Sequence, residues 1–313
     1  MNKIFISTSS FDVTNSAPIL DELRKNSFEI LLNPYGRRLT EAEVIDHLKG
    51  DVVGIIAGVE PLTRKVFENA VGLKVISRCG IGLDNVDLEA AKQHDITVFN
   101  TPAAPVAAVA ELTVGLILSL LRRIPEADRN LRKDQWKSLM GHLLSAQTIG
   151  IIGYGRIGRK VVELLQPFGC RIIFYDVNDS NSYPGLQYVE LQELLKSSDI
   201  VSIHVSSSKQ VLGKNEFNLM KEGSWLINLS RGGVVDECAL YEYLKSGHLS
   251  GAALDVFEKE PYSGKLKELD NVILTPHMGS YAKEARKQME NEAVINLKNG
   301  LIDKGFMTKE GGR

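Results

Sequence analysis

Two patterns of hydrophobic and polar residues alternate along this chain. Short apolar runs of strand length are followed by segments whose apolar residues recur with helical spacing. This alternation predicts an α/β fold with parallel sheets, because each parallel strand needs a crossover helix to reach the next one. The predicted strands cover residues 3–7, 29–32, 52–57, 74–77, 97–99, 149–152, 171–175, 200–205, 225–229, 251–255 and 272–274.

The helices predicted between these strands divide the chain into two doubly wound units. They cover residues 17–26, 41–48, 65–69, 88–94, 191–196, 215–220 and 237–246. A last helix, residues 283–298, follows the second unit and has no partner there, so we expect it to return to the first. The prediction is two parallel-sheet domains, with a Rossmann domain (100–283) inserted into a flavodoxin-like domain (1–99 and 284–313).

Between the two units lies an unusually apolar stretch, residues 106–123. Glu111 and Thr113 interrupt it, and the uninterrupted part is too short for a membrane span. We therefore expect a deeply buried helix, which in an oligomer crosses a subunit interface. In such a helix we interpret Glu111 as a structural carboxylate rather than a site residue.

A glycine-rich fingerprint follows the strand at 149–152. The residues Gly153, Tyr154, Gly155, Arg156, Ile157 and Gly158 form a G-x-G-x-x-G turn into a helix. In this motif the first glycine permits the tight turn, the second lets the backbone approach a pyrophosphate, and the third lets helix and strand pack closely. Asp176 lies 18 residues after Gly158, at the end of the next strand. A carboxylate there accepts hydrogen bonds from ribose hydroxyls and disfavours a 2′-phosphate, so the motif predicts NAD rather than NADP.

Composition limits the classes of function. The 313 residues, 43% hydrophobic, suffice for two domains that each bury a core. The formal net charge of −2 argues against nucleic acid or an anionic membrane as the main partner. No secretory leader is recognisable, and Cys79, Cys170 and Cys238 lack metal-ligand spacing. We therefore expect a cytoplasmic protein with reduced thiols and no metal.

Three chemically active side chains follow strand ends in the last hundred residues. Arg231, Glu260 and His277 each come after a predicted strand, at the edge where ligands of open α/β sheets bind. A guanidinium can grip a substrate carboxylate with two hydrogen bonds. A carboxylate beside an imidazole favours the imidazolium and fixes its tautomer, which suits proton transfer. Each residue alone also has an ordinary structural interpretation, but their succession after a nucleotide motif favours catalysis.

Several segments resemble the D-isomer-specific 2-hydroxyacid dehydrogenases, and within that family the phosphoglycerate dehydrogenases. The resemblance covers nearly the whole chain. Besides the fingerprint it rests on Arg-Cys-Gly-Ile-Gly-Leu-Asp-Asn-Val-Asp at 78–87, Val-Ala-Glu at 109–111, Asn-Leu-Ser-Arg-Gly-Gly-Val-Val-Asp-Glu at 228–237, Gly-Ala-Ala-Leu-Asp-Val-Phe-Glu-Lys-Glu-Pro at 251–261 and Pro-His-Met-Gly-Ser at 276–280.

The resemblance implies a role for each of these segments. It makes Arg231 the group that orients the substrate, His277 the general acid and base, and Glu260 its partner. It places Gly80, Ile81 and Gly82 at the substrate carboxylate, and it implies a homodimer built on the helix at 106–123. Arg78 is expected at the substrate, where its charge suits a phosphate. Around NAD the resemblance places Arg156, Ile157, Asp176, Val205, Leu229, Asp255 and Gly279.

The chain also departs from the family pattern. The segment after His204 is shorter and lacks the usual proline, and Ala57 and Gly58 stand where several phosphoglycerate enzymes carry arginine. The chain ends at Arg313 without a regulatory domain, so feedback control by serine is not expected. Other phosphate ligands would be Arg64, Lys65, Arg132, Lys133 or Lys137.

The substrate expected from the overall pattern is 3-phosphoglycerate, as in serine biosynthesis. Glyoxylate or hydroxypyruvate reductase, or a general D-2-hydroxyacid dehydrogenase, is the main alternative, because the same machinery serves without a phosphate site. A non-enzymatic NAD-sensing corepressor shares the architecture, whereas formate dehydrogenase usually has glutamine where this chain has Glu260.

Overall fold

The computed structural model describes residues 1–179, 181 and 183–308 of the chain. It consists of two compact units, one formed by Met1–Pro105 with Tyr281–Arg313 and the other by Val106–Ser280. The predicted domain boundaries, after residue 99 and before residue 284, differ by a few residues from the boundaries of these two units. The difference arises because the second unit begins with a long helix at Val106 and ends in the loop before Tyr281.

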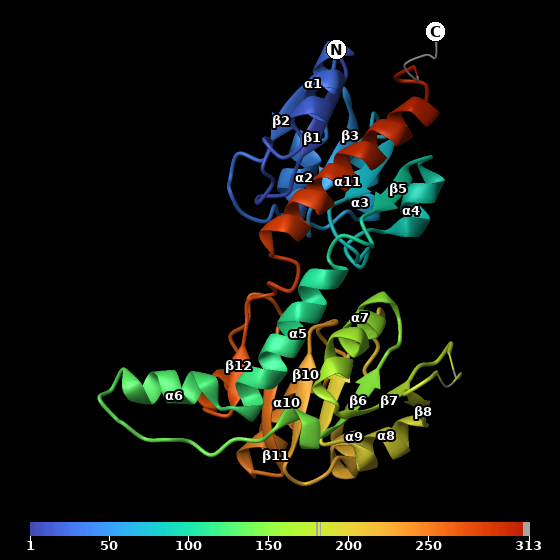
Figure 1. Ribbon diagram of the computed structural model, residues 1–313. Helices are drawn as coiled ribbons and strands as arrows, with labels where there is room; N and C mark the ends of the chain where they lie inside the picture. The colour runs from blue at the N-terminus through green and yellow to red at the C-terminus, as the bar shows by residue number, and fades with distance from the viewer. Residues whose placement is uncertain (180, 182, 309–313) are drawn as a thin grey trace. The chain divides into compact units, whose positions relative to one another are not determined.

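The first unit is a parallel sheet of five strands in the order β2-β1-β3-β4-β5. This is the flavodoxin-like order, as predicted. One face is covered by α1 and α11, and the other by α2, α3 and α4 (Figure 1). The strands are β1 (Lys3–Ile6), β2 (Glu29–Leu32), β3 (Val52–Ala57), β4 (Val75–Arg78) and β5 (Thr97–Asn100), and the helices are α1 (Ala17–Lys25), α2 (Glu41–His47), α3 (Arg64–Asn69), α4 (Leu88–Gln93) and α11 (Lys283–Asp303).

The last helix packs on the first sheet. The hydroxyl of Ser77 on β4 donates a hydrogen bond to the Ala293 carbonyl on α11, at 2.7 Å. Gly300 lets the helix approach closely, because a Cβ there would lie 2.6 Å from the Val75 side chain. The return of this helix to the first unit agrees with the sequence prediction, although α11 continues to Asp303 rather than ending at residue 298.

The second unit is a parallel sheet of seven strands in the order β12-β11-β10-β9-β6-β7-β8. Six of these strands have the Rossmann order, so the predicted fold class is confirmed. The strands are β6 (Thr148–Ile152), β7 (Arg171–Tyr175), β8 (Gln187–Tyr188), β9 (Ile200–Ile203), β10 (Ser224–Asn228), β11 (Leu249–Leu254) and β12 (Val272–Leu274), and the helices are α5 (Val106–Leu121), α6 (Ile124–Leu131), α7 (Arg156–Leu165), α8 (Leu191–Ser197), α9 (Lys214–Leu219) and α10 (Glu237–Lys245), with short 3₁₀ turns at Leu144–Ala146, Gln166–Phe168 and Lys265–Glu268.

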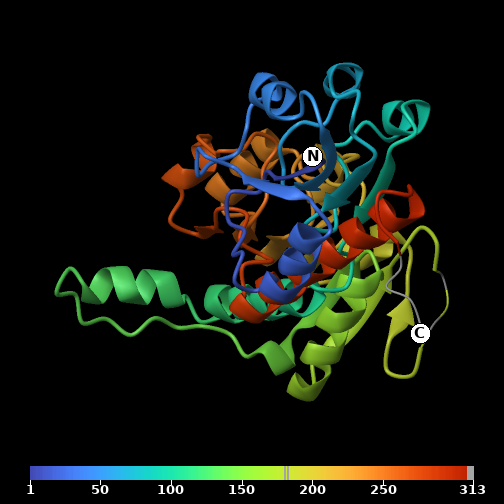
Figure 2. The same ribbon diagram turned by 90° about the horizontal axis from the view of Figure 1, so that it is seen from above.

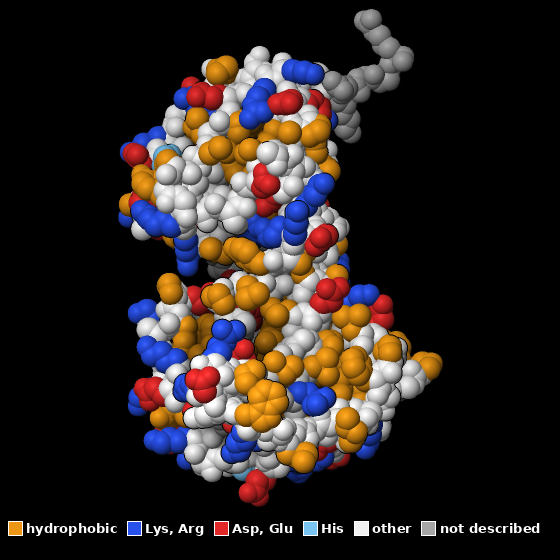
Figure 3. Space-filling model, turned by 60° about the vertical axis from the view of Figure 1, so that its left-hand side comes forward, with side chains coloured by type: hydrophobic (Ala, Val, Ile, Leu, Met, Phe, Trp, Pro, Cys, Tyr) orange, Lys and Arg blue, Asp and Glu red, His pale blue; other side chains and the backbone are white. Residues whose placement is uncertain are grey.

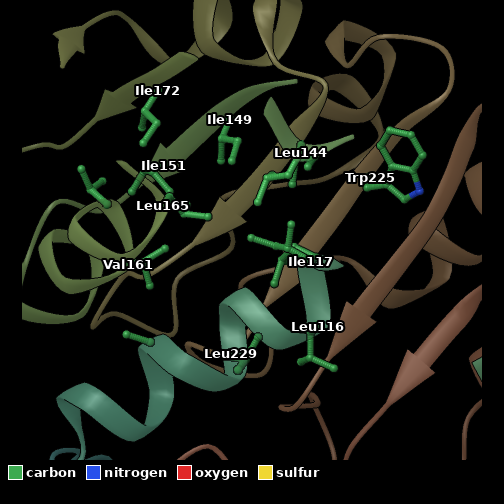
Figure 4. Close-up of a cluster of buried hydrophobic side chains, with 14 of the residues drawn as sticks. Leu116, Ile117, Leu144, Ile149, Ile151, Val161, Leu165, Ile172, Trp225 and Leu229 are labelled. Carbon is green, nitrogen blue, oxygen red and sulfur yellow. The ribbon is translucent and has the colours of Figure 1, made fainter. Parts of the chain in front are cut away.

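Helices α5 and α7 lie side by side on one face of this sheet, and α8, α9 and α10 cover the other. The core under α5 and α7 joins Leu116 and Ile117 to strand residues such as Ile149 and Ile151 (Figure 4). Burying such apolar side chains is the main force that fixes the helices on the sheet. The nucleotide fingerprint therefore begins from a rigid base.

Helix α5 is less completely buried than its composition predicts. Ala107, Glu111 and Gly115 recur with helical spacing along one exposed stripe of it. Glu111 is thus exposed in the single chain, and its interpretation as a structural carboxylate stays a prediction. Among the described residues, no helix is both long enough and apolar enough to cross a membrane.

Candidate active site

The turn from β6 into α7 depends on two of its glycines. Gly153 has a φ of +94°, and a Cβ there would lie 2.7 Å from the carbonyl oxygen of His204. A Cβ on Gly158 would clash with the Gly153 carbonyl oxygen. Both positions therefore exclude every larger residue, as the fingerprint requires.

Gly155 has a different role, because the backbone alone does not demand glycine there. It is the N-cap residue of α7 with a φ of −76°, and no atom lies within 4 Å of where its Cβ would stand. The amides of the first turn of α7, which includes Arg156 and Ile157, have no intrahelical acceptor. Open space in front of a helix N-terminus of this kind suits a pyrophosphate.

Asp176 joins the second strand of this unit to the glycine turn. Its Oδ2 accepts a hydrogen bond from the Tyr154 amide at 2.7 Å, and its Oδ1 accepts one from the Asn178 amide at 2.8 Å. A carboxylate has about four acceptor positions, so capacity remains for ribose hydroxyls. Asp176 thus fits the predicted role and also holds the turn in place.

A second set of contacts holds the turn from the side, and sequence reasoning missed it. The Arg159 guanidinium lies 4.3 Å from the centre of the Tyr154 ring, and its Nε donates to the Tyr154 carbonyl at 3.0 Å. Its Nη2 pairs with Asp179 at 2.7 Å. The fingerprint showed only that position 154 is variable, and nothing in the local pattern links Arg159 to Asp179.

Arg231 follows β10, at the carboxyl end of the second sheet. Asn228 shapes this turn: its Oδ1 accepts from the amide and hydroxyl of Ser230, and its Nδ2 donates to the Arg231 carbonyl at 3.1 Å. The Arg231 Nη1 donates to the Ser230 carbonyl at 2.9 Å. The guanidinium is thereby oriented within its own loop.

His277 and Glu260 form a hydrogen-bonded pair in the same unit. The His277 Nδ1 lies 2.8 Å from Oε2 of Glu260, and the imidazole is about half exposed. This hydrogen bond raises the pKa of His277, burial opposes it, and the negative charges of Glu260 and Asp255 add to the rise, whereas the Arg231 charge lowers it. The opposite ring nitrogen is then the atom that can exchange a proton with a ligand.

Asp255 anchors the loop that carries His277. It is buried, and its Oδ1 accepts from the Thr275 hydroxyl at 2.6 Å and from the Met278 amide at 2.8 Å. Its Oδ2 accepts from the Gly279 amide at 2.7 Å. Asp255 and Gly279 were both predicted as cofactor contacts, and in this structure they are hydrogen-bonded to each other.

The remaining predicted cofactor contacts follow the central strands. Val205 lies two residues after the end of β9, and Leu229, which is buried, comes directly after β10. Beside Val205, His204 is buried with its Nε2 2.9 Å from the Ser202 hydroxyl. Burial lowers the pKa of His204 to about 4, so this imidazole is neutral near pH 7.

The predicted substrate loop lies in the first unit, after β4. Gly80 has a φ of +147°, and its amide donates to the Thr101 hydroxyl at 2.8 Å. The Gly80 amide therefore has a partner within the protein, and the placement of Gly80 at the substrate carboxylate through backbone groups stays a prediction. Ile81 is braced through its carbonyl, which accepts from Asn100 Nδ2 at 2.8 Å. Among the described residues, no hydrogen bond engages the amides of Ile81 and Gly82.

Four of the six side chains expected to hold a phosphate have partners of their own. The Arg78 guanidinium donates to the Cys79 carbonyl. Arg64 donates to Gln93 at 2.6 Å, and Lys65 lies 3.5 Å from Glu41. Arg132 pairs with Asp128 at 2.8 Å, while Lys133 and Lys137 are exposed.

Within the described part of the chain, no group of three or more His, Cys, Asp or Glu side chains is arranged to hold a metal ion. In the second unit, Arg231, Glu260 and His277 follow strands at the same edge of the sheet as the glycine turn.

Comparisons with known proteins identify the family and agree with the fold. Residues 114–279 match the family model of the D-isomer specific 2-hydroxyacid dehydrogenase, NAD binding domain. The chain is 42% identical over 273 residues to D-3-phosphoglycerate dehydrogenase of Methanocaldococcus jannaschii, covering 84% of this chain but only 52% of that protein. It is 38% identical over 295 residues to hydroxypyruvate reductase of Thermotoga maritima, covering 88% of this chain and 95% of the relative.

A solved structure is similar over nearly the whole chain. D-lactate dehydrogenase of Aquifex aeolicus, determined with NAD and lactic acid, has a TM-score of 0.84 and 30% sequence identity, covering 97% of this chain and 96% of its own.

Proposed function

Because the chain belongs to the D-isomer-specific 2-hydroxyacid dehydrogenase family, we propose that it transfers a hydride between a D-2-hydroxy acid and NAD. The observation that carries this proposal is the 2.8 Å hydrogen bond between His277 and Glu260, in the unit whose glycine turn is open for a dinucleotide. A histidine held in one tautomer by a carboxylate is the group that such a reaction needs for its proton.

His277 moves the proton. In oxidation its neutral Nε2 takes the proton of the substrate hydroxyl, and in reduction the imidazolium returns it to the carbonyl oxygen. Glu260 stabilises the imidazolium, and Arg231 pairs with the substrate carboxylate and fixes the reacting carbon. NAD supplies the hydride acceptor. The glycine turn, the first turn of α7 and Asp176 would hold that cofactor.

For the substrate, we propose a short 2-keto acid without a phosphate, of the glyoxylate and hydroxypyruvate class. The observation in favour is that Arg78, Arg64, Lys65 and Arg132 all have hydrogen-bond or ion-pair partners within the protein. The coverage of a hydroxypyruvate reductase over 95% of its length supports the same class.

The substrate expected from the sequence, 3-phosphoglycerate, is the second candidate. It is favoured by the 42% identity to a phosphoglycerate dehydrogenase, of which the chain spans about half the length. Surface ion pairs are also weak, so a phosphate could recruit one of these cations.

The test is a panel of 2-keto acids with NADH, followed by absorbance. Glyoxylate, hydroxypyruvate and 3-phosphohydroxypyruvate are compared by kcat/KM, and the products of the last two, glycerate and 3-phosphoglycerate, are analysed for D configuration. Charge-assisted phosphate contacts are worth about 1.5–3 kcal/mol each, so a phosphate site would favour the phosphorylated acid by roughly tenfold or more. NADH binding without any turnover would instead support the corepressor alternative.

We also propose that two copies of the chain form a dimer through residues 124–143, which we call the arm. None of α6 is buried, and Trp136, Met140 and Leu143 are 90, 88 and 68% exposed. The arm extends away from the rest of its unit (Figure 2), and hydrophobic side chains gather on this unit's face in Figure 3. Exposed apolar patches of this kind are typical of interfaces. Light scattering should give a dimer mass, and serine at Trp136 and Met140 should shift it toward the monomer.

A further inference from the structure

Glu237 is a partly buried carboxylate that the mechanism above does not use. It is the first residue of α10, and the preceding Asp236 already caps the helix by accepting from the Ala239 amide at 2.9 Å. Glu237 instead reaches out of the helix, where its Oε1 accepts a hydrogen bond from the Glu258 amide at 2.6 Å. Its contact is therefore with another loop rather than with its own helix end.

That loop is the segment 257–260, which ends at Glu260. Inside it, the Phe257 amide donates to Oε1 of Glu260 at 3.1 Å. Two successive amides of the segment are thus held by two carboxylates, one from Glu260 itself and one from Glu237. The position of the Glu260 side chain depends on both.

The other side of the same segment lies against the Arg231 loop. A Cβ on Gly232 would clash with the carbonyl oxygen of Phe257, so the two backbones are in direct contact. The segment is therefore fixed between Gly232 and α10. Since Arg231 precedes Gly232, this packing connects the substrate-orienting arginine to the carboxylate that pairs with His277.

The charges in this region are coupled. Burial raises the pKa of Glu237, and the negative charges of Glu258 and Glu260 raise it further, while the hydrogen bond from the Glu258 amide lowers it. Tyr262 is a further titratable neighbour of Glu237, and burial and the negative charges of Glu237, Cys238 and Glu268 raise the pKa of Tyr262. On the histidine side, Glu260 and Asp255 favour the imidazolium and Arg231 opposes it. Glu237 therefore adds negative charge beside the Glu260–His277 pair.

We propose that Glu237 is a positioning residue for the reaction, which holds the segment carrying Glu260 and adds its charge to the Glu260–His277 pair. This inference rests on the proposed function, in which that pair moves the proton. Glu237 acts through Glu260 and does not touch the substrate.

The experiment compares Glu237→Ala and Glu237→Gln with the control Glu242→Ala, an exposed position on the same helix. Glutamine keeps an acceptor for the Glu258 amide and removes the charge. We expect Glu237→Gln to keep kcat at its optimum and to move the acid limb of oxidation to lower pH, because the imidazolium loses a favourable charge. Glu237→Ala should lower kcat about tenfold with an unchanged KM for NAD, because loss of the anchor impairs only part of the 10²- to 10⁴-fold contribution of proton transfer. The control should match the wild type in all three measurements.

A merely structural glutamate would give a different result. Both variants would then lower the temperature of thermal unfolding while leaving kcat and the pH profile of the folded enzyme unchanged, and this outcome would overturn the inference. A second readout does not need turnover: the His277 imidazole is titrated by NMR in the wild type and in Glu237→Gln. A lower pKa in the variant supports the inference, whereas an identical pKa contradicts it. A wild-type enzyme inactive on the whole panel would count against the proposed function instead.

Discussion

Glu260 lies 2.8 Å from His277 although 16 residues separate them in the chain, and the hydrogen bond joins two loops that follow neighbouring strands. The pair raises the pKa of His277, so the folded protein favours the imidazolium. By linkage, this contribution to stability is complete below the pKa of an unfolded histidine and is lost as the pH rises through the raised value.

The first prediction concerns this pair. Glu260→Gln removes the charge partner and lowers the pKa of His277 toward its ordinary value. Oxidation needs neutral His277, so its acid limb in kcat/KM should move to lower pH. Reduction needs the imidazolium, so its alkaline limb should move to lower pH as well. The measurement is a pair of pH–rate profiles, and two unshifted profiles would contradict the pairing.

His277→Ala, which removes the proton carrier, should cost about 10²- to 10⁴-fold in kcat while NADH still binds.

The second prediction concerns Asp255, the anchor of the His277 loop. Asp255→Ala leaves the amides of Met278 and Gly279 without their acceptor, and an orphaned buried donor costs about 1–3 kcal/mol. We expect a lower free energy of unfolding together with a loss of kcat, because His277 is no longer held. Urea unfolding and kinetics on the same sample check this. A stability loss without a change in kcat would mean that the loop keeps its geometry by other contacts.

The predicted and observed secondary structure agree best where the pattern of apolar residues determines the bounds of an element. The strands β2, β3, β7 and β12 have the predicted bounds. For β3 this follows from a continuous apolar run that is buried on both faces, whereas β2 and β12 are partly exposed edge strands that were marked by shorter apolar runs. Helix α6 was not predicted: it has only eight residues, with a proline in its first turn, and none of them is buried. The strand β8 has only two residues and gives no periodic signal.

Some features of the candidate site could likewise be predicted from the sequence, and others could not. Arg231, Glu260 and His277 could be found from the sequence because each follows a strand end, and parallel topology brings such ends to one edge. Asp255 with Gly279, Glu237 with Glu258, and Thr101 with Gly80 are contacts between distant segments. Their geometry depends on how loops pack, which no local pattern encodes.

The third prediction separates two glycines of the fingerprint. Gly158→Ala should destabilise the second unit, because the new Cβ clashes with the Gly153 carbonyl oxygen. Gly155→Ala should leave the free energy of unfolding nearly unchanged, since its Cβ meets no atom within 4 Å, and should weaken NADH binding because it fills the space left for the pyrophosphate. Chemical denaturation and NADH fluorescence titration measure the two effects. Unchanged NADH affinity in Gly155→Ala would place the pyrophosphate elsewhere.

The fourth prediction concerns acid stability. His204 is buried and its pKa is lowered to about 4, so folding disfavours its protonation. The stability that depends on the neutral imidazole is complete above the unfolded pKa of about 6.5 and is lost as the pH falls from there toward 4. The loss is at most about 3 kcal/mol at 1.36 kcal/mol per unit. Glutamine at position 204 can still bond Ser202 and does not titrate, so the variant should lose less stability between pH 7.5 and 5 in urea unfolding. Equal losses would show that other groups dominate.

The last prediction concerns cofactor choice. Asp176 accepts a hydrogen bond from the Tyr154 amide and stands where the adenosine ribose is proposed to bind, so its charge opposes a 2′-phosphate. The wild type should therefore use NAD much better than NADP. Asp176→Ala should narrow this ratio from both sides: the NAD reaction weakens because the turn and the ribose each lose an acceptor, and the NADP reaction improves because the repulsion is gone. Asp179→Asn serves as the control, since it removes a charge that pairs with Arg159 outside the proposed ribose contact. The measurement is kcat/KM for both cofactors at low ionic strength, where the charge effect is largest. Similar values for NAD and NADP in the wild type, or a ratio that Asp179→Asn changes as much as Asp176→Ala, would remove Asp176 as the determinant of cofactor choice.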